Sequence, residues 1–155
     1  LLQRVTEATV RVDGELVGRT GPGLLVLLGV ERGDTDADGE RLLERVLTYR
    51  VFDDEAGRMN RSLLDTGGGL LVVSQFTLAA ETRKGTRPGF STAAPPDEGR
   101  RLYERFVAEA RAKVREVGTG SFGAHMQVSL VNDGPVTFSL RVAPSGTPTP
   151  PAGSD

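Results

Sequence analysis

Continuous apolar runs and helically spaced apolar positions define the strongest elements that the sequence predicts. Residues 24–30 and 70–76 are two runs of mainly apolar side chains, which is typical of strands that are buried on both faces. Apolar side chains recur at helical spacing in residues 42–49 and, more clearly, in residues 97–117. Two prolines precede the longer stretch and a glycine follows it, so this helix has both a start and a stop signal.

Weaker patterns predict the remaining strands. Short strands are expected at residues 4–12, 15–19, 49–52, 126–131 and 136–142. Asp13-Gly14 is a hairpin signal between the first two, and Asn132-Asp133-Gly134-Pro135 would form the turn between the last two. The order of elements predicts an α/β fold with mixed β-sheets, two main helices packed on one face and a barrel-like layered arrangement.

Length and composition fit a single domain. The chain has 155 residues, of which 37% are hydrophobic and 26% charged, which suits one soluble domain and leaves no room for two. We expect this domain to cover residues 1–143. Residues 144–155 are rich in proline, glycine and serine and have no apolar pattern to bury, so we expect a disordered C-terminal tail.

Composition and charge exclude several function classes. The sequence has no cysteine, which excludes thiol nucleophiles, iron-sulfur clusters and disulfides, and its one histidine, His125, leaves little scope for a metal site. The formal net charge of −2 gives no overall attraction to nucleic acid, so any polyanion must be met locally. The longest apolar run is far shorter than the ~20 residues that span a bilayer. The start of the sequence shows no signal-peptide pattern, so we expect a cytoplasmic protein that does not act at a membrane.

Two segments are candidates for a functional site. Residues 74–80, Ser-Gln-Phe-Thr-Leu-Ala-Ala, stand where a buried strand turns polar at its carboxyl end, a common place for ligands in sheet proteins. Gln75 and Thr77 would share one face of that strand. The second segment is residues 132–137, Asn-Asp-Gly-Pro-Val-Thr. Each segment also has a purely structural interpretation. In that interpretation the first is only a strand end whose hydroxyls satisfy backbone groups, and the second is only a hairpin turn.

A short basic loop is a further candidate. Arg83, Lys84 and Arg87 are opposed only by Glu81, which leaves a local net charge of +2 that suits contact with phosphates. A solvated loop without function is the alternative.

The single histidine has two interpretations. His125 could serve Ser74 or Thr77 as a general base. The sequence has no Gly-x-Ser-x-Gly segment around a nucleophile, which favours the other interpretation, a partly exposed histidine at a strand edge.

From Gln3 to Val142 the chain resembles the bacterial D-aminoacyl-tRNA deacylases. The resemblance is carried by Gly-Leu-Leu-Val-Leu-Leu-Gly-Val at residues 23–30, Ser-Gln-Phe-Thr-Leu at residues 74–78 and Val-Ser-Leu-Val-Asn-Asp-Gly-Pro-Val-Thr at residues 128–137. It implies a compact α/β homodimer without cofactor or metal. The implied substrate is the ester that joins a D-amino acid to the terminal adenosine of tRNA.

The same resemblance implies roles for individual residues. The catalytic segment of one chain would consist of Ser74, Gln75, Phe76 and Thr77. The other chain would supply the peptide Gly134-Pro135, in cis and held in place by Arg4, as the group that selects chirality.

The chemistry of the substrate limits what the site must provide. An aminoacyl ester is already activated, so orientation and backbone N–H donors at Phe76 and Thr77 could suffice. Whether Thr77 attacks, or the 2′-hydroxyl of the terminal ribose assists a water molecule, stays open. The lack of a clear base beside Thr77 favours assistance by the RNA. Phe76 is also a candidate surface for the adenine, and Arg83, Lys84 and Arg87 are candidates for contact with the RNA.

Two other functions stay open at this point. A related proofreading deacylase would remove a wrongly attached L-amino acid, with a trans Gly-Pro peptide and a wider pocket. An RNA-binding module without chemistry is disfavoured, because only 5% of the residues are aromatic and the net charge is −2. If the Gly-Pro backbone rejects L-amino acids by steric clash alone, glycyl-tRNA should be hydrolysed as well.

Overall fold

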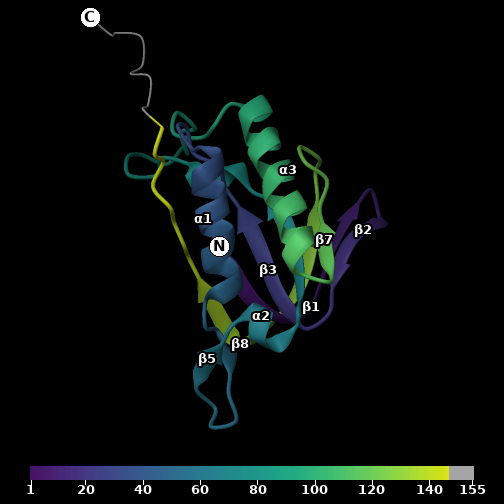
Figure 1. Cartoon of the computed structure of the whole chain (residues 1–155). Coiled ribbons are helices and arrows are strands. Elements are labelled where there is room, and N and C mark those ends of the chain that lie inside the picture. Colours follow the sequence, from purple (N-terminus) through teal and green to yellow (C-terminus); the bar gives the residue numbers. More distant parts are fainter. Residues whose placement is uncertain (147–155) are drawn as a thin grey trace, which may run out of the picture.

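A computed structural model describes residues 1–146, which form one mixed sheet with helices packed on one face (Figure 1). In the sheet the order is β2-β1-β3-β6-β7, and β8 pairs with β1. The strands of this sheet are β1 (Leu2–Val12), β2 (Glu15–Thr20), β3 (Gly23–Leu28), β6 (Gly69–Ser74), β7 (Val117–Thr119) and β8 (Gln127–Phe138). The other elements are α1 (Asp36–Thr48), the hairpin of β4 (Phe52–Asp53) and β5 (Met59–Arg61), α2 (Leu63–Thr66), the 3-10 helix η1 (Phe76–Ala79) and α3 (Pro96–Lys113).

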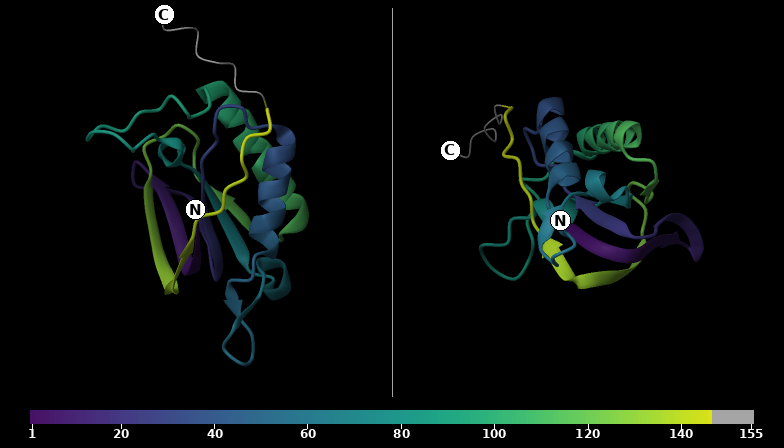
Figure 2. Two further views of the ribbon diagram at one scale, coloured as in Figure 1. Left: turned by 90° about the vertical axis from the view of Figure 1, so that its left-hand side faces the viewer. Right: turned by 60° about the horizontal axis from the view of Figure 1, so that its bottom comes forward.

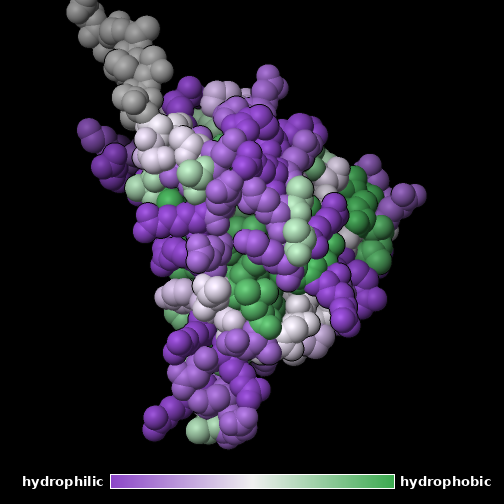
Figure 3. Space-filling view, viewed as in Figure 1, coloured by the Kyte–Doolittle hydropathy of each residue, from purple (hydrophilic) through white to green (hydrophobic). Residues whose placement is uncertain are grey.

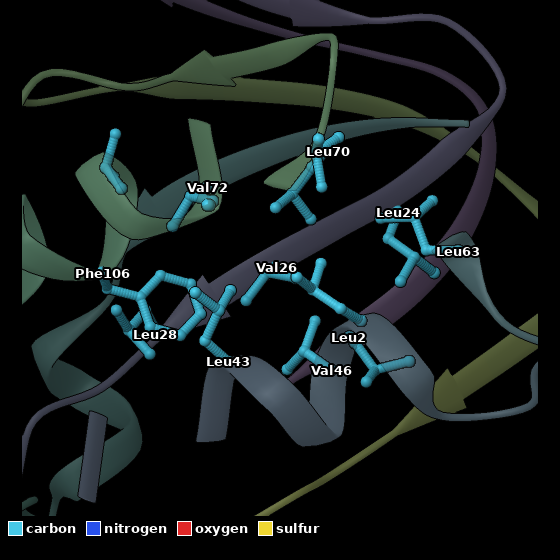
Figure 4. Packing of buried hydrophobic residues seen from close by; sticks show 14 of the residues in the cluster. Leu2, Leu24, Val26, Leu28, Leu43, Val46, Leu63, Leu70, Val72 and Phe106 are labelled. Carbon is cyan, nitrogen blue, oxygen red and sulfur yellow. The ribbon is translucent and has the colours of Figure 1, made fainter. Parts of the chain in front are cut away.

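The two apolar runs form the parallel centre of the sheet. β3 and β6 pair in parallel from Gly23 opposite Gly69 to Leu28 opposite Ser74. Alternate side chains of β3 point to opposite faces: Leu24 packs in the cluster beneath the helices (Figure 4), and Leu25 packs in a second cluster on the other face. The prediction of strands buried on both faces is confirmed, and the polar end of β6 is thereby fixed at Ser74.

Helices α1 and α3 lie side by side on one face of the sheet, as predicted (Figure 2). α1 begins after Thr35, whose hydroxyl accepts from the Asp38 N–H while the Asp38 carboxylate accepts from the Thr35 N–H. Arg105 of α3 binds Asp36 of α1 at 2.9 Å. Hydrophilic side chains cover much of the outer face of both helices (Figure 3). No described helix has both the length and the apolar character needed to cross a membrane.

The sheet curls until β2 and β7 approach each other. A Cβ atom on Gly18 would lie 1.9 Å from the Thr119 carbonyl oxygen, and one on Gly118 would lie 2.4 Å from that of Arg19. Only glycine permits this approach of the two backbones. The result is a nearly closed, barrel-like sheet in a single domain, which confirms the predicted fold class.

The predicted hairpin at residues 132–135 is wrong. β8 is one strand from Gln127 to Phe138, and it pairs antiparallel with β1 on both sides of residues 133–136. Val5 pairs with Asn132 and Gln3 pairs with Thr137, so the single residue Arg4 faces four residues of β8. Because both flanks stay paired with the same neighbour, the extra residues form an irregular corner within the strand instead of reversing the chain. We call residues 132–137 the β8 corner.

Several boundaries also differ from the predictions. β6 ends at Ser74, and the following residues turn into η1, so the strand predicted to reach residue 76 stops two residues earlier. The strand predicted at residues 49–52 is confined to β4. α3 ends at Lys113 because Val114 is extended, with φ −120° and ψ 133°, and the chain continues toward β7.

The end of the described chain is attached to α1. The Ser145 N–H donates to the Asp38 carboxylate at 2.9 Å, and the Gly146 N–H donates to the Gly33 carbonyl at 2.9 Å. The predicted disordered tail therefore has its first three residues in contact with the domain. Its remainder, residues 147–155, lies outside the described residues.

Candidate active site

The Ser-Gln-Phe-Thr segment (residues 74–77) marks the change from β6 to η1. The Gln75 N–H donates to the Leu28 carbonyl at 2.8 Å, which ties the turn to the end of β3. The Gln75 side-chain amide donates to the Thr77 hydroxyl, so the two side chains meet, although through a helical turn and not through a strand. Phe76 and Thr77 open η1, so their N–H groups have no acceptor within that helix. The segment thus presents backbone donors beside a paired amide and hydroxyl.

A cavity of about 470 Å³ adjoins this segment. It lies between the end of β6, the start of α3 and the loop before β8. The rings of Tyr103 and Phe122 lie 5.6 Å apart in its wall, and the Tyr103 hydroxyl donates to the Val72 carbonyl at 3.0 Å. A mostly apolar wall with a few polar groups suits a small ligand that has a planar apolar part. Its lining includes Ser74, Gln75, Phe76, Tyr103, Phe122 and His125.

Phe76 is the most exposed of the large apolar side chains in the described chain. Its side chain is 62% exposed, and its ring lies 5.1 Å from that of Phe90. An exposed pair of aromatic rings at the rim of a cavity can stack with nucleobases.

His125 lies at the same cavity but does not form a catalytic pair with a hydroxyl. It lines the cavity together with Ser74, and the described residues give no hydrogen bond from its imidazole to Ser74 or Thr77. The Thr77 hydroxyl is instead in contact with an amide, which is not a base. The geometry gives no support for a general base at this position.

The β8 corner is held by polar contacts from β1 and from within the corner. The Arg4 Nε donates to the Asp133 carbonyl at 2.9 Å, and Arg4 Nη1 donates to the Val51 carbonyl at 2.9 Å. Asn132 accepts from the Val136 N–H at 3.0 Å and donates to the Thr137 hydroxyl at 2.8 Å. Arg4 therefore contacts the residue that precedes Gly134, and its role in holding the Gly-Pro peptide stays a prediction, whereas sequence reasoning gave no role to Asn132.

Glycine is required at the centre of this corner. Gly134 has φ 141°, and a Cβ atom there would lie 2.6 Å from Val136 Cγ2 and 2.9 Å from the Val136 nitrogen. The Gly134-Pro135 peptide bond is cis, and both residues are exposed. The corner therefore exposes backbone atoms at the surface of the chain.

The two candidate segments do not meet within one chain. In the sheet, Arg4 pairs with Leu24 and Leu24 with Leu70, whereas Ser74 lies four residues further along β6. At about 3.3 Å per strand residue, this separates the two rows by roughly 13 Å along the strand direction alone. The corner and the cavity thus lie at opposite ends of the central strands.

The basic loop is partly neutralised. The Arg83 guanidinium binds the Glu81 carboxylate at 2.8 and 2.7 Å, and these hydrogen bonds lower the pKa of Glu81 to about 2. Lys84 and Arg87 are exposed in the same loop. The part of the loop available to an anion is therefore smaller than its residue types suggest. Among residues 1–146, no group of three acidic or histidine side chains is placed to hold a metal ion.

Known proteins share this fold. A solved structure titled as a probable eukaryotic D-amino acid tRNA deacylase has the same fold, with a TM-score of 0.75 at 18% identity over 85% of this chain and 92% of that one. Another, titled c-Myc DNA Unwinding Element Binding Protein, has a TM-score of 0.88 at 40% identity over 92% of this chain and 97% of that one. The architecture is thus that of the tRNA deacylase fold.

Sequence comparison specifies the family. Residues 1–141 match the family model described as D-Tyr-tRNA(Tyr) deacylase, and the chain belongs to this family. A protein of Paracidovorax citrulli named D-aminoacyl-tRNA deacylase is 67% identical over 147 residues, which are 95% of each chain. A protein of the same name from Thioalkalivibrio sulfidiphilus is 66% identical over 144 residues, which are 93% of this chain and 97% of that one.

Proposed function

We propose that the protein is a hydrolase that cleaves the ester bond of D-aminoacyl-tRNA. The observation that carries the proposal is the Ser-Gln-Phe-Thr segment, which ends β6 directly at a cavity with aromatic walls. The family membership and the names of relatives at 66–67% identity support the same activity. We propose that the protein acts in the cytoplasm, because its substrate, aminoacyl-tRNA, is made and used there.

The cavity suits the terminal adenosine of the tRNA. Its apolar wall, with the rings of Tyr103 and Phe122, would hold the adenine. The ribose would then bring its aminoacyl ester to Gln75 and Thr77 at the cavity edge. Phe76, exposed beside Phe90, would stack with RNA at the rim. Lys84 and Arg87 would contact phosphates further along the acceptor end.

The reaction is a hydrolysis in which water adds to the ester carbonyl carbon. The oxyanion that develops would accept hydrogen bonds from the N–H groups of Phe76 and Thr77. The bond between the carbonyl carbon and the ribose O3′ then breaks, and O3′ takes up a proton. Because Thr77 has only an amide as its partner, we assign the proton transfers to the neighbouring 2′-hydroxyl and water, with Thr77 shaping the site.

A homodimer would complete the site. One chain keeps its Gly-Pro peptide and its cavity at opposite ends of β3 and β6, so the Gly134-Pro135 of a partner would have to enter the cavity region. The sheet face away from the helices carries Leu27 and Leu130, which are only partly buried and would suit coverage by a second copy. Light scattering should give about twice the 16.5 kDa chain mass. An active monomer would exclude a shared site.

Selectivity would follow from where the partner's peptide lies. An exposed backbone corner has no side chain to recognise a D-residue, so it would act by occupying the space of an L side chain. Glycine has no side chain to exclude, and we propose that glycyl-tRNA is also hydrolysed.

One assay tests these statements together. Parallel time courses on D-tyrosyl-, glycyl- and L-tyrosyl-tRNA should show hydrolysis of the first two and not of the third. Faster cleavage of the L-form would instead identify the related proofreading activity on L-aminoacyl-tRNA. Cleavage of the D-form alone would mean that the site recognises the D side chain. Lack of hydrolysis with every substrate would contradict the enzymatic function.

A further inference from the structure

A guanidinium lies against the aromatic wall of the cavity beside the Ser-Gln-Phe-Thr segment. The Arg100 side chain extends from α3, and its Cζ atom lies 4.8 Å from the centre of the Phe122 ring, which lines the cavity. Gly99, the preceding residue of the helix, lines it as well, and a Cβ atom there would lie 3.8 Å from Phe122 Cζ. A cation within about 6 Å of a ring centre is attracted by the π electrons. A lining side chain therefore places Arg100 at the rim of the cavity.

The hydrogen-bond donors of Arg100 have no acceptor in the described part of the chain. Its Nη1 lies 3.8 Å from a carboxylate oxygen of Glu104, which is longer than a hydrogen bond. Both side chains are more than half exposed, and an arginine four residues before a glutamate is the weaker order on a helix. The neighbouring Arg101 differs, because it donates to Glu98 at 2.6 Å and to Asp36 at 2.7 Å. Arg100 thus keeps its N–H groups available to a group outside the chain.

The residues that line the cavity carry no permanent charge. Their side chains are apolar or neutral, apart from the titratable Tyr103 and His125. The Tyr103 hydroxyl donates to the Val72 carbonyl, and burial raises its pKa, so it stays neutral. An arginine, in contrast, keeps its charge at all physiological pH values and presents pairs of N–H groups that match a phosphate. A phosphate at this rim would therefore meet a fixed positive charge.

We propose that Arg100 binds the phosphodiester on the 5′ oxygen of the nucleotide whose base occupies the cavity. This inference rests on the proposed function, which places the terminal adenine beside Tyr103 and Phe122. The terminal nucleotide has no phosphate on its 3′ side, so the anionic group nearest to its base is its own 5′ phosphodiester. A base next to Phe122 brings this group to the rim where the guanidinium lies. Arg100 is thus a binding residue that selects a nucleotide over a nucleoside.

Two small probes separate the role of the phosphate from that of the base. Adenosine tests the cavity, and adenosine 5′-methylphosphate adds a phosphodiester with one constant negative charge. We expect the methylphosphate to bind the wild type about tenfold more tightly than adenosine. This preference should stay the same from about pH 6 to about pH 8, because neither the phosphodiester nor the guanidinium titrates there. NMR titrations of the two probes measure both dissociation constants.

Substitutions of Arg100 and of its neighbour should change the preference in opposite directions. Arg100→Gln should abolish it and leave adenosine binding within about twofold of the wild type. Arg100→Lys keeps the charge without the paired donors, so about a threefold preference should remain. Glu104→Gln removes the competing carboxylate and should strengthen binding of the methylphosphate about twofold. Arg41→Gln removes a positive charge from the exposed side of α1, and this matched control should behave as the wild type. Thermal melts check that each variant folds.

The whole substrate distinguishes a binding role from a catalytic one. With D-tyrosyl-tRNA, Arg100→Gln should raise the protein concentration that gives half the maximal single-turnover rate about three- to tenfold. The dependence of this concentration on salt should weaken by about one unit of logarithmic slope, as expected for the loss of one phosphate contact. The maximal rate should stay that of the wild type, because the guanidinium does not contact the ester.

Each outcome decides a different point. Equal binding of the two probes to the wild type, or a preference that Arg100→Gln retains, would overturn the role of Arg100 while hydrolysis of D-tyrosyl-tRNA left the proposed function in place. A preference that appeared only below about pH 6.5 would assign the phosphate to His125 and would overturn it as well. If neither probe bound, the assignment of the cavity to the terminal adenosine would fail, and the inference would fall with it.

Discussion

The carboxyl end of β6 and the β8 corner carry the two candidate segments, and they are built in opposite ways. The end of β6 borders a cavity of about 470 Å³, and the side chains of Gln75 and Thr77 bind each other there. The β8 corner does not line this cavity in the described structure. Hydrogen bonds to Arg4 and Asn132 hold its backbone, and its Gly-Pro peptide is exposed. Under the proposed function, the first region would receive the substrate and the second would be inserted by a partner chain. Neither alone has what a selective esterase site needs.

Mixing two inactive variants is the strongest test of this complementarity. Gly134→Val should reduce D-tyrosyl-tRNA hydrolysis at least 100-fold, because φ 141° and a Cβ contact of 2.6 Å to Val136 would displace the corner that positions the substrate. Ala94→Trp should block the cavity and be equally inactive. In a random mixture, about a quarter of the wild-type rate should return, because mixed dimers would hold one intact site.

The control is a mixture of the two variants in which subunits have not exchanged, and it should stay inactive. If the mixture stayed inactive after both variants had been refolded together, corner and cavity would have to act within one chain, against the separation measured along β6.

Removal of the substrate's 2′-hydroxyl probes the cavity side alone. We expect about a 100-fold slower reaction with 2′-deoxy-terminated D-tyrosyl-tRNA, whereas Thr77→Ala should cost less than about tenfold, because a nucleophile's removal typically costs about 10⁴-fold or more. Single-turnover kinetics measure both. The reverse order of effects would make Thr77 the nucleophile and remove the role given to the RNA.

Arg4→Gln weakens the corner side alone. The Arg4 side chain is 11% exposed and donates to the carbonyls of Val51 and Asp133, so its loss should reduce the free energy of unfolding by about 1–3 kcal/mol. Urea denaturation measures this. Rejection of L-tyrosyl-tRNA should weaken in parallel. Arg32→Gln, which loses one bond to the Ser91 carbonyl in an exposed loop, is the matched control and should change neither quantity.

The smallest effect concerns how the cavity end attracts tRNA. Glu81→Gln should release Arg83 and strengthen tRNA binding about threefold, with a steeper dependence on salt by about one unit. Filter binding at several salt concentrations measures both.

The charge of Glu81 should not depend on pH in the usual range. The pKa of Glu81 is about 2, so its carboxylate loses its charge only as the pH falls through that value. The effect of the Glu81–Arg83 pair on tRNA binding by the wild type should therefore stay unchanged from pH 7 to pH 5. A fall in affinity with Glu81→Gln would show that the carboxylate orders the loop for RNA.

Local sequence patterns were sufficient for the elements that local physics determines. The buried runs at residues 24–30 and 70–76 became β3 and β6, and the helical stripe after the two prolines became α3. The Ser-Gln-Phe-Thr segment also lies at the end of a buried strand, as the sequence predicts, although the strand stops at Ser74. Such patterns depend on near neighbours in the sequence, and tertiary contacts only moved their boundaries.

Features set by distant contacts could not be predicted in this way. Asn132-Asp133-Gly134-Pro135 has the composition of a hairpin turn, and only the pairing of both flanks with β1 makes it a corner. The cavity was missed for the same reason: Phe122 lies in a glycine-containing turn, and its place in a wall depends on Tyr103 of α3. The family resemblance supplied Arg4 and the Gly-Pro peptide, and it implied that this peptide comes from the other chain, but it did not reveal the cavity.

The two hydrogen bonds of the Asp38 carboxylate link the start of α1 to a segment 107 residues later in the chain. The amide protons of Thr35 and Ser145 share this one acceptor residue, so the first turn of the helix and the C-terminal segment should open as a unit in hydrogen exchange. A truncation that removes Ser145 would leave the helix cap with Thr35 alone, whereas a fusion placed after residue 146 would keep both partners. The choice of expression boundary therefore affects the local stability of α1, a helix that supports the sheet beneath the active end of the molecule.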